Sequence, residues 1–462
     1  MSFGMVGFLA GLGLARVWQI QFVFVGFVLL SLVVVRRRKR LVIVLFVASM
    51  TLFGVWRGGN VMEQAAIYDE LENTQVTLHV TAKEDGYYGK NRSLTFKADD
   101  VVLAGQKLIG QIEVAGRGVN AVYAGDRLTV SGSLYRKRGL TQAGISFAQF
   151  DLISRGSSPI DSFRRNFATG LLNVLPEQLA SFGLGLLIGS RNTLNEEINE
   201  ELIAVGLIHI VAVSGYNLTV IINQVKTRFG RSRIQTLVFS LAFISVFLLM
   251  TAGEPSIVRA ALVSSVSMIF WYFGRTIKPL LLLLLVAALT AGINPLYLWS
   301  SIGWYLSFAA FFGVLILSPA VTARFFNKHK ENPVLQLTTE TTAAQVCTLP
   351  IILYIFGRLS LVGILSNVLT GLFIPIAMLF TFLAGIAGMS HAPLAGLIAF
   401  PAKIVLQYIL GIAKLLAKIP YANIEFQISL AGMITFVLVI ALITWVLVRS
   451  QKNVIISENQ GA

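Results

Sequence analysis

The stretch that decides the fold is Gly206-Leu207-Ile208-His209-Ile210-Val211-Ala212-Val213-Ser214-Gly215-Tyr216-Asn217-Leu218, which opens an apolar run that continues to about Val225. A helix needs about 20 residues to cross a hydrocarbon core about 30 Å thick, and this run is long enough. Polar and small residues inside such a run are costly in lipid and usually face a helix bundle or a wet cavity. Here they are His209, Ser214, Gly215 and Asn217.

The whole chain has the composition of a membrane protein. Of its 462 residues, 55% are hydrophobic and only 13% are charged, and the mean hydropathy is +0.75. These values exclude an ordinary soluble protein of this size, so we predict a polytopic α-helical membrane protein. The single cysteine, Cys347, excludes an intramolecular disulfide.

The net charge of +15 is explained by basic residues in the expected cytoplasmic loops. Basic residues cluster between the apolar stretches, and such clusters mark cytoplasmic loops. The clusters are Arg36, Arg37, Arg38, Lys39 and Arg40; Lys226, Arg228, Arg231 and Arg233; Arg275 and Lys278; Arg324, Lys328 and Lys330; and Arg449 and Lys452. The basic balance alone is therefore weak evidence for binding to DNA.

Apolar stretches and turn signals divide the chain into five predicted segments. They are N-terminal transmembrane helices in 1–60, an extracytoplasmic β domain in 69–155, amphipathic or interfacial helices in 160–204, a transmembrane core in 205–449 and a short polar tail in 450–462. Alternating sides along this series places both termini in the cytoplasm and every basic cluster with them. The expected location is a bacterial inner (plasma) membrane.

Further spans are expected after the core stretch, and two of them are atypical. The expected spans lie at about 234–251, 257–273, 279–293, 301–318, 337–356, 361–388, 394–417 and 427–448. The span at 361–388 is long and carries Pro375. The span at 394–417 carries Lys403 and Lys414 with Lys418 just beyond, which indicates an amphipathic or tilted helix.

Residues 69–155 have the pattern of a small β domain. Runs such as 75–80 and 93–98 alternate polar with apolar and β-branched residues, the period of half-buried strands. Turn residues such as Asp85-Gly86 and Ala104-Gly105 separate the runs. Five or six short strands suit a small barrel, and we predict an OB-like fold.

An OB-like domain suggests contact with single-stranded DNA, because such folds combine basic grooves with aromatic stacking platforms. The candidates are Tyr87, Tyr88, Lys90, Arg92, Arg127, Arg136, Lys137 and Arg138, with Tyr123 and Tyr135 nearby. Basic and acidic residues are nearly balanced across the domain, however, and scattered charges and turn tyrosines are common on any barrel. Both interpretations remain open.

Several short motifs follow the core stretch in a fixed order. They are Pro255-Ser256-Ile257-Val258-Arg259-Ala260, Asn294-Pro295, Gly303-Trp304-Tyr305-Leu306-Ser307-Phe308-Ala309, Ala344-Gln345, Thr348-Leu349-Pro350, Phe356-Gly357 and Ser366-Asn367. Together with 206–218 they resemble the ComEC family, bacterial competence channels that pass single-stranded DNA across the inner membrane. The resemblance implies a ComEC-like competence core in 205–449, and an OB-like domain before it.

The sequence departs from the family pattern in two respects. Family members usually carry a histidine where this chain has Asn217, after a leucine where it has Tyr216. Many relatives also carry a metallo-β-lactamase-like domain, whose His-x-His-x-Asp-His signature does not occur here. The four histidines, His79, His209, His329 and His391, are too scattered for that metal site. We therefore expect no metal, no cofactor and no nuclease activity in this polypeptide.

A polyanion needs a wet path, and broken helices are tolerated at membrane depth where they line such a path. The candidates for a polar core are His209, Ser214, Gly215, Asn217, Glu254, Pro255, Ser256, Arg259, Asn294, Ser307, Gln345 and Asn367. Arg259 lies inside an expected span, where charge usually marks a functional site. It would meet phosphate, or pair with Glu254 or a backbone carbonyl. A neutral His209 bonded between helices explains that residue equally well.

The family resemblance implies an inner-membrane channel for uptake of single-stranded DNA during natural transformation. Expected partners are single-stranded DNA, membrane lipids, a DNA receptor, an external nuclease, and a cytoplasmic helicase or single-strand-binding protein; a homo-oligomer is left open. No Walker motif occurs, so an ATP motor would be another polypeptide. Two alternatives remain: a secondary transporter of a small solute, and a membrane-embedded enzyme that uses His209, Glu254 and Arg259 on a lipid-linked or polymeric substrate.

Overall fold

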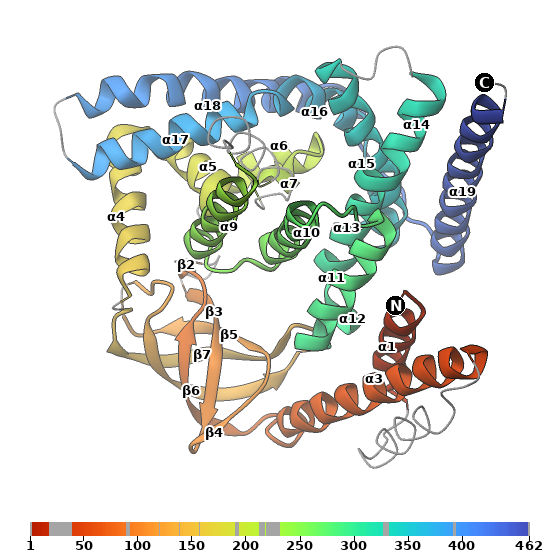
Figure 1. Cartoon of the computed structure of the whole chain (residues 1–462). Coiled ribbons are helices and arrows are strands. Elements are labelled where there is room, and N and C mark those ends of the chain that lie inside the picture. The colour runs from red at the N-terminus through yellow and green to blue at the C-terminus, as the bar shows by residue number, and fades with distance from the viewer. Residues whose placement is uncertain are drawn as a thin grey trace. The chain divides into compact units, whose positions relative to one another are not determined.

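The computed structural model describes residues 2–17, 39–88, 93–119, 121–137, 139–156, 158–189, 194–211, 218, 232–326, 332–390 and 394–460. The chain forms two compact units (Figure 1). The first unit contains Met1–Arg165 and Leu284–Trp304, and the second contains Asn166–Leu283 and Tyr305–Ala462.

In the first unit, helix α1 (Ser2–Leu14) packs closely against helix α3 (Lys39–Glu70) (Figure 1, red). Glycines allow the close approach: a Cβ atom added at Gly11 would lie 1.9 Å from the carbonyl oxygen of Thr51, and one at Gly54 would lie 2.3 Å from that of Phe8. Small residues are the usual means of bringing two helices together in lipid. By contrast, a Cβ atom at Gly13 would meet nothing within 4 Å.

The same helix pair is tied to the segment that joins helices α11 (Pro279–Ile293) and α12 (Leu296–Ser300). The guanidinium of Arg57 donates to the carbonyl oxygens of Gly292 at 3.1 Å and Ile293 at 3.0 Å, at the C-terminal end of α11. A cation is favourable there, because the last carbonyls of a helix have no partner within it. The indole of Trp299 donates to the carbonyl oxygen of Leu12 at 2.9 Å.

Seven strands follow α3 in the described part of the first unit. They are β1 (Gln75–Ala82), β2 (Tyr87–Tyr88), β3 (Leu94–Leu103), β4 (Gln106–Lys107), β5 (Gln111–Arg117), β6 (Arg127–Arg136) and β7 (Thr141–Ser154). Their order is β1-β6-β7-β5-β3-β2, with β4 beside β3 and an additional pairing of β1 with β3. Only β5 and β7 pair in parallel. The OB-like form of this sheet remains a prediction.

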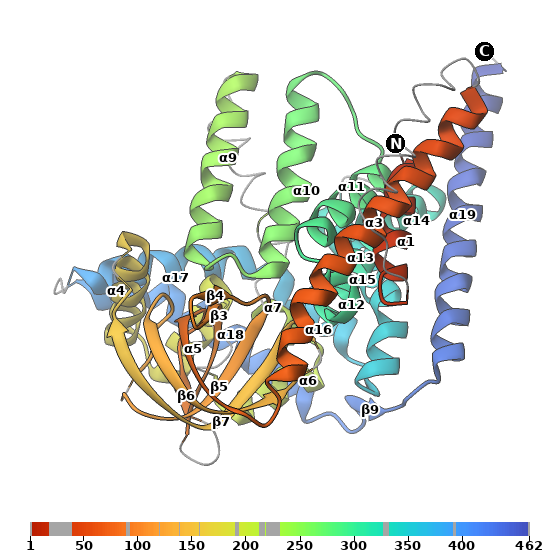
Figure 2. The same cartoon turned by 90° about the horizontal axis from the view of Figure 1, so that it is seen from below.

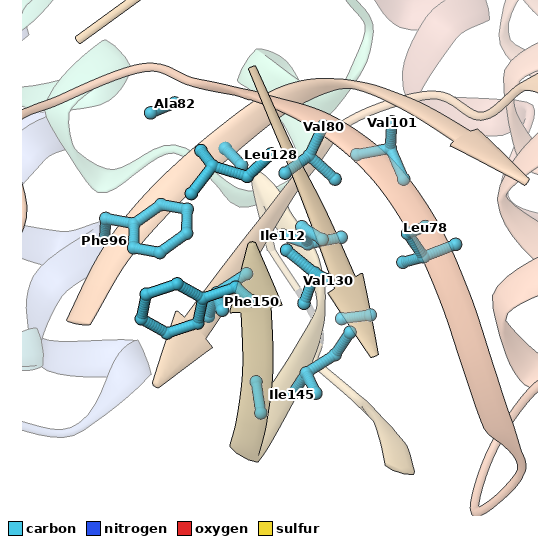
Figure 3. Close-up of a cluster of buried hydrophobic side chains, with 14 of the residues drawn as sticks. Leu78, Val80, Ala82, Phe96, Val101, Ile112, Leu128, Val130, Ile145 and Phe150 are labelled. Carbon is cyan, nitrogen blue, oxygen red and sulfur yellow. The ribbon is translucent and has the colours of Figure 1, made fainter. Parts of the chain in front are cut away.

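The inner face of the sheet holds a dense apolar core, shown in Figure 3. The rings of Phe96 on β3 and Phe150 on β7 meet edge to face, with centroids 5.4 Å apart. Both side chains are fully buried, as are Leu78, Ile112 and Val130. Alternation along β1, where even-numbered residues are buried and most odd-numbered ones exposed, produces this face, as the sequence pattern predicted.

One buried carboxylate holds the end of the sheet together. Asp126 is fully buried and accepts hydrogen bonds from the guanidinium of Arg155 at 2.6 Å and the backbone N–H groups of Tyr123 at 2.9 Å and Gly156 at 3.0 Å. A buried charge needs this degree of pairing to offset its desolvation. The contact fixes the chain as it leaves β7 toward α4 (Pro159–Val174).

The second unit is helical except for one short two-stranded sheet among its described residues. Its elements are the C-terminal part of α4, α5 (Glu177–Ile188), α6 (Glu196–Ala204), α7 (Ile208–Val211), α9 (Arg233–Met250), α10 (Pro255–Tyr272), most of α13 (Ile302–Phe312), the π-helix η1 (Gly313–Leu317), α14 (Ser318–Phe325), α15 (Pro333–Ile355), β8 (Arg358–Ser360), α16 (Gly363–Gly371), α17 (Ile374–Met389), α18 (Ala395–Ala417), β9 (Asn423–Glu425) and α19 (Leu430–Gln460). Strands β8 and β9 pair antiparallel.

The predicted amphipathic segment after the β domain begins with α4, which buries part of its apolar side chains and exposes Leu172. Phe167 and Leu171 are fully buried, and the ring of Phe167 stacks on Phe382 of α17 at 5.9 Å. Glycines again bring the backbones together, because a Cβ atom at Gly388 would lie 2.0 Å from the carbonyl oxygen of Gly170. This part of α4 packs on the helices of the second unit.

The chain is a multi-pass membrane protein by the length and composition of its helices. Six helical segments of the described chain are long and apolar enough to cross a membrane: 42–70, 233–250, 255–272, 302–325, 395–417 and 430–450. The span predicted at 361–388 is instead two helices, α16 and α17, bent by 53°. Leu372 and Phe373 lie at the break, just before Pro375, whose missing N–H and fixed φ favour a new helix start.

Candidate functional site

The first half of the fold-deciding stretch forms a tight turn after α6. Gly206 has φ +71°, a left-handed conformation that favours glycine. The N–H of Leu207 donates to the carbonyl oxygen of Leu202 at 2.8 Å, which closes the end of α6. His209 follows on the short helix α7, and its Nδ1 lies 2.9 Å from the carbonyl oxygen of Gly206. The turn therefore presents His209 at an exposed edge.

This turn lies against the start of α16 and the end of β8. A Cβ atom added at Gly206 would lie 3.4 Å from both Gly363 Cα and Ser360 Cβ. That separation is ordinary van der Waals contact, so a methyl group just fits and a larger side chain does not. The glycines at 206 and 363 thus bring together two stretches of backbone that are far apart in the sequence of the competence-like core.

A serine and an asparagine of α16 bind carbonyl groups at this contact. The hydroxyl of Ser366 lies within donating distance of the carbonyl oxygens of Val205, at 2.7 Å, and Gly363, at 2.9 Å. The amide of Asn367 donates to the carbonyl oxygen of Gly363 at 2.7 Å. Ser366 is fully buried. Such bonds satisfy backbone groups that would otherwise be costly to bury.

Helix α15 adds a further polar group to the same place. The Nε2 atom of Gln345 lies 2.9 Å from the position that a Cβ atom at Gly363 would take, and Ser360 Oγ lies 3.4 Å from it. Gln345 Oε1 and Ser360 Oγ are both buried, and neither finds a hydrogen-bond partner among the described residues. Buried polar atoms are normally paired with protein or with ordered water. We call this set, Val205, Gly206, His209, Gln345, Ser360, Gly363, Ser366 and Asn367, the polar junction.

The antiparallel pairing of β8 with β9 holds Ser360 in place. Ser360 pairs with Asn423 and Arg358 with Glu425, and the N–H of Leu361 donates to the carbonyl oxygen of Ala422 at 2.9 Å. The side chain of Arg358 also approaches Glu200 of α6 at 3.5 Å, a pair that is largely exposed. Exposed pairs contribute little, so the backbone bonds are the main support.

The chemistry that the polar junction offers is hydrogen bonding without fixed charge. Its members supply hydroxyl, amide and carbonyl groups, and His209 is the one titratable residue among them. No group of three or more His, Cys, Asp and Glu side chains suited to a metal ion occurs in the described part of the chain. Neutral polar groups of this kind suit a hydrated lining next to a polar cargo.

Four predicted core residues of the second unit lie on α10 or at its start. Glu254 and Pro255 occupy the first positions of the helix, after the left-handed residues Ala252 and Gly253. Ser256 is half-buried in the first turn. Arg259 is buried, with 3% of its surface exposed, in a helix apolar enough to span a membrane. A buried arginine there needs polar surroundings.

The remaining predicted core residues have separate environments. Ser307 lies half-buried on α13 in the second unit. Asn294 belongs to the first unit, where its side-chain oxygen accepts the N–H of Leu296 at 3.0 Å, just before α12. Ser214, Gly215 and Asn217 lie outside the described residues. Of the predicted core residues, the structure therefore brings Gln345 and Asn367 together at Gly363, and His209 lies on the turn that packs against this glycine.

Three of the predicted DNA-contact residues are exposed in the sheet. Tyr87 and Tyr88 form β2, with 37% and 62% of their surfaces exposed, and Arg127 is exposed at the start of β6. Tyr123 is 38% exposed, with the guanidinium groups of Arg155 and Arg165 at 5.2 and 6.0 Å from its ring centroid. Lys90, Arg92 and Arg138 lie outside the described residues.

Arg136 and Lys137 are engaged with other side chains of the first unit. Arg136 donates to Asp69 at 2.7 Å and to the backbone carbonyl of Gln142 at 2.7 Å, which joins the end of α3 to the sheet. Lys137 pairs with Glu113 at 2.9 Å and lies 5.6 Å from the ring centroid of Tyr135. Burial alone would lower the pKa of Lys137, but its hydrogen bond and charge pairing with Glu113 raise the pKa overall.

Sequence reasoning missed Ser360 and Gly363 as members of the site. Both lie between the quoted motifs Phe356-Gly357 and Ser366-Asn367, and this region has several turn-forming residues. Gly357 has φ +60°, so the chain turns there into β8. A polar residue between two closely spaced glycines was the available signal, since such glycines often mark close backbone approach.

Comparisons with known proteins concern mainly the second unit. A family model described as "Competence protein" matches residues 186–452. The ComE operon protein 3 of Bacillus subtilis (strain 168) is 29% identical to the chain over 246 residues, which make up 52% of this chain and 30% of that protein. The chain thus spans about a third of the length of that relative. No solved structure matches the chain significantly.

Proposed function

Since the chain belongs to the ComEC family of competence proteins, we propose that it is a channel that passes single-stranded DNA inward across a bacterial inner membrane during natural transformation. The observation that carries this proposal is the position of the polar junction. Every one of its residues lies within 186–452, the part that matches the family. The junction would then be part of the lining along which the DNA moves.

The physical demand on such a lining is severe. Each nucleotide carries a charged phosphate, and a charge in a low-dielectric interior is expensive unless polar groups or water surround it. The polar junction offers hydroxyl, amide and carbonyl groups, two of which are buried without a partner among the described residues. Those two groups favour water at the junction, and a hydrated surface lets a polyanion pass without binding tightly.

We further propose that the sheet of the first unit is an OB-like domain on the extracytoplasmic side. Two features support the topology: β5 and β7 pair in parallel, and β1 pairs with β6 on one side and with β3 on the other. In OB folds the face of the second and third strands and the loops beside it bind oligonucleotides. Here β3 and β5 take those places, and strand β2 lies between β1 and β3 in the chain.

In this proposal the aromatic residues, rather than the cations, carry the contact of the sheet with DNA. Tyr87 and Tyr88 are exposed on β2, where bases are able to stack on them. The cations nearby are less available, because Lys97 pairs with Glu84 at 3.3 Å and Lys137 with Glu113 at 2.9 Å. The proposed strand is supplied by a DNA receptor and an external nuclease, and is received by a cytoplasmic helicase or single-strand-binding protein.

The test is natural transformation combined with uptake of labelled DNA into a nuclease-protected compartment. A strain that lacks the chain is complemented with the wild type, with Gln345→Leu, or with Thr338→Val as a control on the same helix. Thr338 is half-buried, and its hydroxyl donates to the carbonyl oxygen of Val334 in its own helix at 2.7 Å, so its replacement leaves the junction intact. We expect Gln345→Leu to lose uptake at a normal membrane level, and Thr338→Val to keep it. Normal uptake in the deletion strain would rule the channel out.

A further inference from the structure

Helix α18 has three distinct faces along its length. One face is buried and made mostly of small residues, repeated at alternating steps of four and three: Ala395, Ala399, Ala402, Leu406, Ile409, Ala413 and Leu416. This face packs in the second unit, where α18 contacts α17, α5 and α6. Another face exposes apolar side chains, among them Leu397 at 70%, Ile404 at 51% and Leu415 at 64%.

The third face of α18 is a stripe of polar side chains. Lys403, Gln407, Lys414 and Lys418 follow one another at steps of four, seven and four residues, which places them on one side of a helix. Lys414 and Lys418 are exposed and Lys403 is half-buried. Fifteen residues separate the first and last lysine, so the stripe is about 22 Å long at 1.5 Å per residue.

No carboxylate neutralises this stripe within the described part of the chain. The ion pairs of the second unit that involve described residues do not include Lys403, Lys414 or Lys418. Three unpaired lysines beside an exposed apolar face are unfavourable in hydrocarbon, where each charge costs several kcal/mol. Lysines in this position require an anionic or aqueous environment along the whole stripe.

The direction of α18 within the second unit supplies that environment. Figures 1 and 2 both draw α17 and α18 lengthwise across the view, whereas Figure 2 draws α9, α10 and α19 upright. Helix α19 is the most apolar of the candidate spans, and most of its side chains are exposed. If α9, α10 and α19 cross the membrane, α18 lies along its surface, although its length and composition alone would allow it to span.

We propose that α18 lies flat in the membrane interface and that Lys403, Lys414 and Lys418 bind the phosphate groups of anionic lipids. This site is independent of the proposed passage of DNA. A flat α18 sets all three lysines at one depth, where their ammonium groups reach the headgroups while Leu397, Ile404 and Leu415 enter the acyl region. An upright α18 would spread the lysines over about 22 Å of depth.

The predicted topology of the C-terminal helix is compatible with this placement. Helix α17 packs alongside α18, so a flat α18 implies that α17 does not cross the membrane either. The expected spans at 361–388 and 394–417 are then both removed. Because two crossings are lost, α19 keeps the orientation predicted from the basic residues Arg449 and Lys452.

Lipid rather than DNA is the favoured ligand because of the neighbouring face. The lysine stripe borders directly on exposed leucine and isoleucine side chains, and this combination of cations and large aliphatic groups on one helix is typical of interfacial helices. Single-stranded DNA is bound instead by cations together with aromatic stacking platforms. On the exposed faces of α18, the two aromatic residues are Phe400 and Tyr408, and Tyr408 is engaged by the carbonyl of Leu369 at 3.1 Å and by the ring of Phe373.

The lipid site is tested with the full chain carrying Cys347→Ser and Gly411→Cys. A Cβ atom at Gly411 meets nothing within 4 Å, so a fluorophore fits there without disturbing the helix. The labelled protein is reconstituted in vesicles of phosphatidylcholine containing a small fraction of nitroxide-headgroup lipid, either phosphatidylglycerol or phosphatidylcholine. The preference for anionic lipid is measured as the ratio of fluorescence quenching by nitroxide phosphatidylglycerol to quenching by nitroxide phosphatidylcholine.

We expect nitroxide phosphatidylglycerol to quench more strongly, since each lysine near an anionic surface contributes about fivefold to attraction. Replacing the three lysines by glutamine should abolish the preference, and replacing them by arginine should retain it. Equal quenching in the wild type would overturn the lipid site. A fluorescence response to a single-stranded oligonucleotide that the glutamine variant loses, with the lipid preference unchanged, would assign the stripe to DNA and also overturn it.

The flat orientation has its own readout. Lys403 and Lys418 are replaced by cysteine one at a time in the Cys347→Ser chain, and the protein is reacted with an impermeant maleimide in sealed vesicles of one protein orientation. We expect both positions to react from the same side. Reaction from opposite sides would show that α18 spans the membrane, and the proposal would be wrong.

Discussion

The hydroxyl of Ser366 lies 2.7 Å from the backbone carbonyl oxygen of Val205, a hydrogen bond between residues 161 positions apart. It fastens the turn after α6 to the first turns of α16, and both partners are buried. The polar junction therefore depends on a long-range bond between two segments that each contain a motif of the ComEC family.

Replacing Ser366 by alanine removes the donor and leaves the carbonyl of Val205 buried without its partner. We expect the free energy of unfolding to fall by about 1–3 kcal/mol, the usual cost of such a group. Thermal unfolding of the purified protein in detergent measures the change. Ser245→Ala is the matched control, because Ser245 is exposed and bonds only Leu241 in its own helix. Equal effects of both variants would show that the bond to Val205 adds nothing.

Substitutions at Gly206 and Gly253 distinguish the cost of backbone strain from the cost of steric crowding. Both have positive φ, +71° and +64°, but only Gly206 has neighbours within 4 Å of an added Cβ atom. We expect alanine at either position to cost about 1–2 kcal/mol from the left-handed conformation. Leucine should lower the free energy of unfolding distinctly more at Gly206 than at Gly253, because at position 206 it would push Ser360 and Gly363 away from the turn. Similar stability of the two leucine variants would contradict the close packing of the polar junction.

Gly11 and Gly13 test the helix pair of the first unit in the same way. A Cβ atom at Gly11 would collide with the backbone of Thr51 at 1.9 Å, while Gly13 faces open space. Gly11→Ala should destabilise the α1–α3 pair by about 1–3 kcal/mol, the range for overpacking. Gly13→Ala should be neutral or slightly stabilising, since alanine favours helix. The measurement is the yield of a cross-link between one cysteine on α1 and one on α3. We expect Gly11→Ala to lower this yield and Gly13→Ala to leave it unchanged.

Asp99 on β3 gives a pH dependence with a defined sign. Burial, followed by the neighbouring charge of Asp100, raises its pKa above the usual value of 3.8. The folded state thus holds the proton more tightly than the unfolded state, and the free energy of unfolding falls as pH rises from the unfolded pKa to the folded one.

Asp99→Asn removes this loss, so we expect it to stabilise the sheet at pH 7 and to have little effect below the unfolded pKa. The difference in stability is measured by unfolding the two proteins across a pH series and monitoring unfolding through protease digestion of the sheet. A constant difference at every pH would mean that ionisation of Asp99 is not its cause.

Local sequence patterns predicted the positions of the helices better than the way in which the helices pack. The expected spans at 234–251 and 257–273 agree with α9 and α10, because apolar run length is a local property of the sequence. The span expected at 361–388 consists of two helices, α16 and α17, bent by 53°. Glycine and proline near its middle permitted the break, but only packing in the second unit fixes a bend there.

The site was harder to predict because its bonds are long-range. His209 and Asn367 were noted as polar residues in apolar surroundings, and Gln345 belongs to one of the motifs that resemble the ComEC family. Ser360 has no such signal, since its role arises from the approach of Gly206 in the folded chain. Likewise, Arg136 stands in a basic run, and its bond to Asp69, 67 residues away, is invisible until the chain is folded.

The most direct test of the channel uses His209, which the polar junction exposes at its edge. A His209→Cys, Cys347→Ser chain is expressed in competent cells of the deletion strain and modified with a bulky thiol reagent, and nuclease-protected labelled DNA is measured before and after modification. The account predicts that complete modification reduces protected DNA to the level of the deletion strain, while DNA still binds outside the cell. Full modification with unchanged uptake would contradict a DNA path along the polar junction.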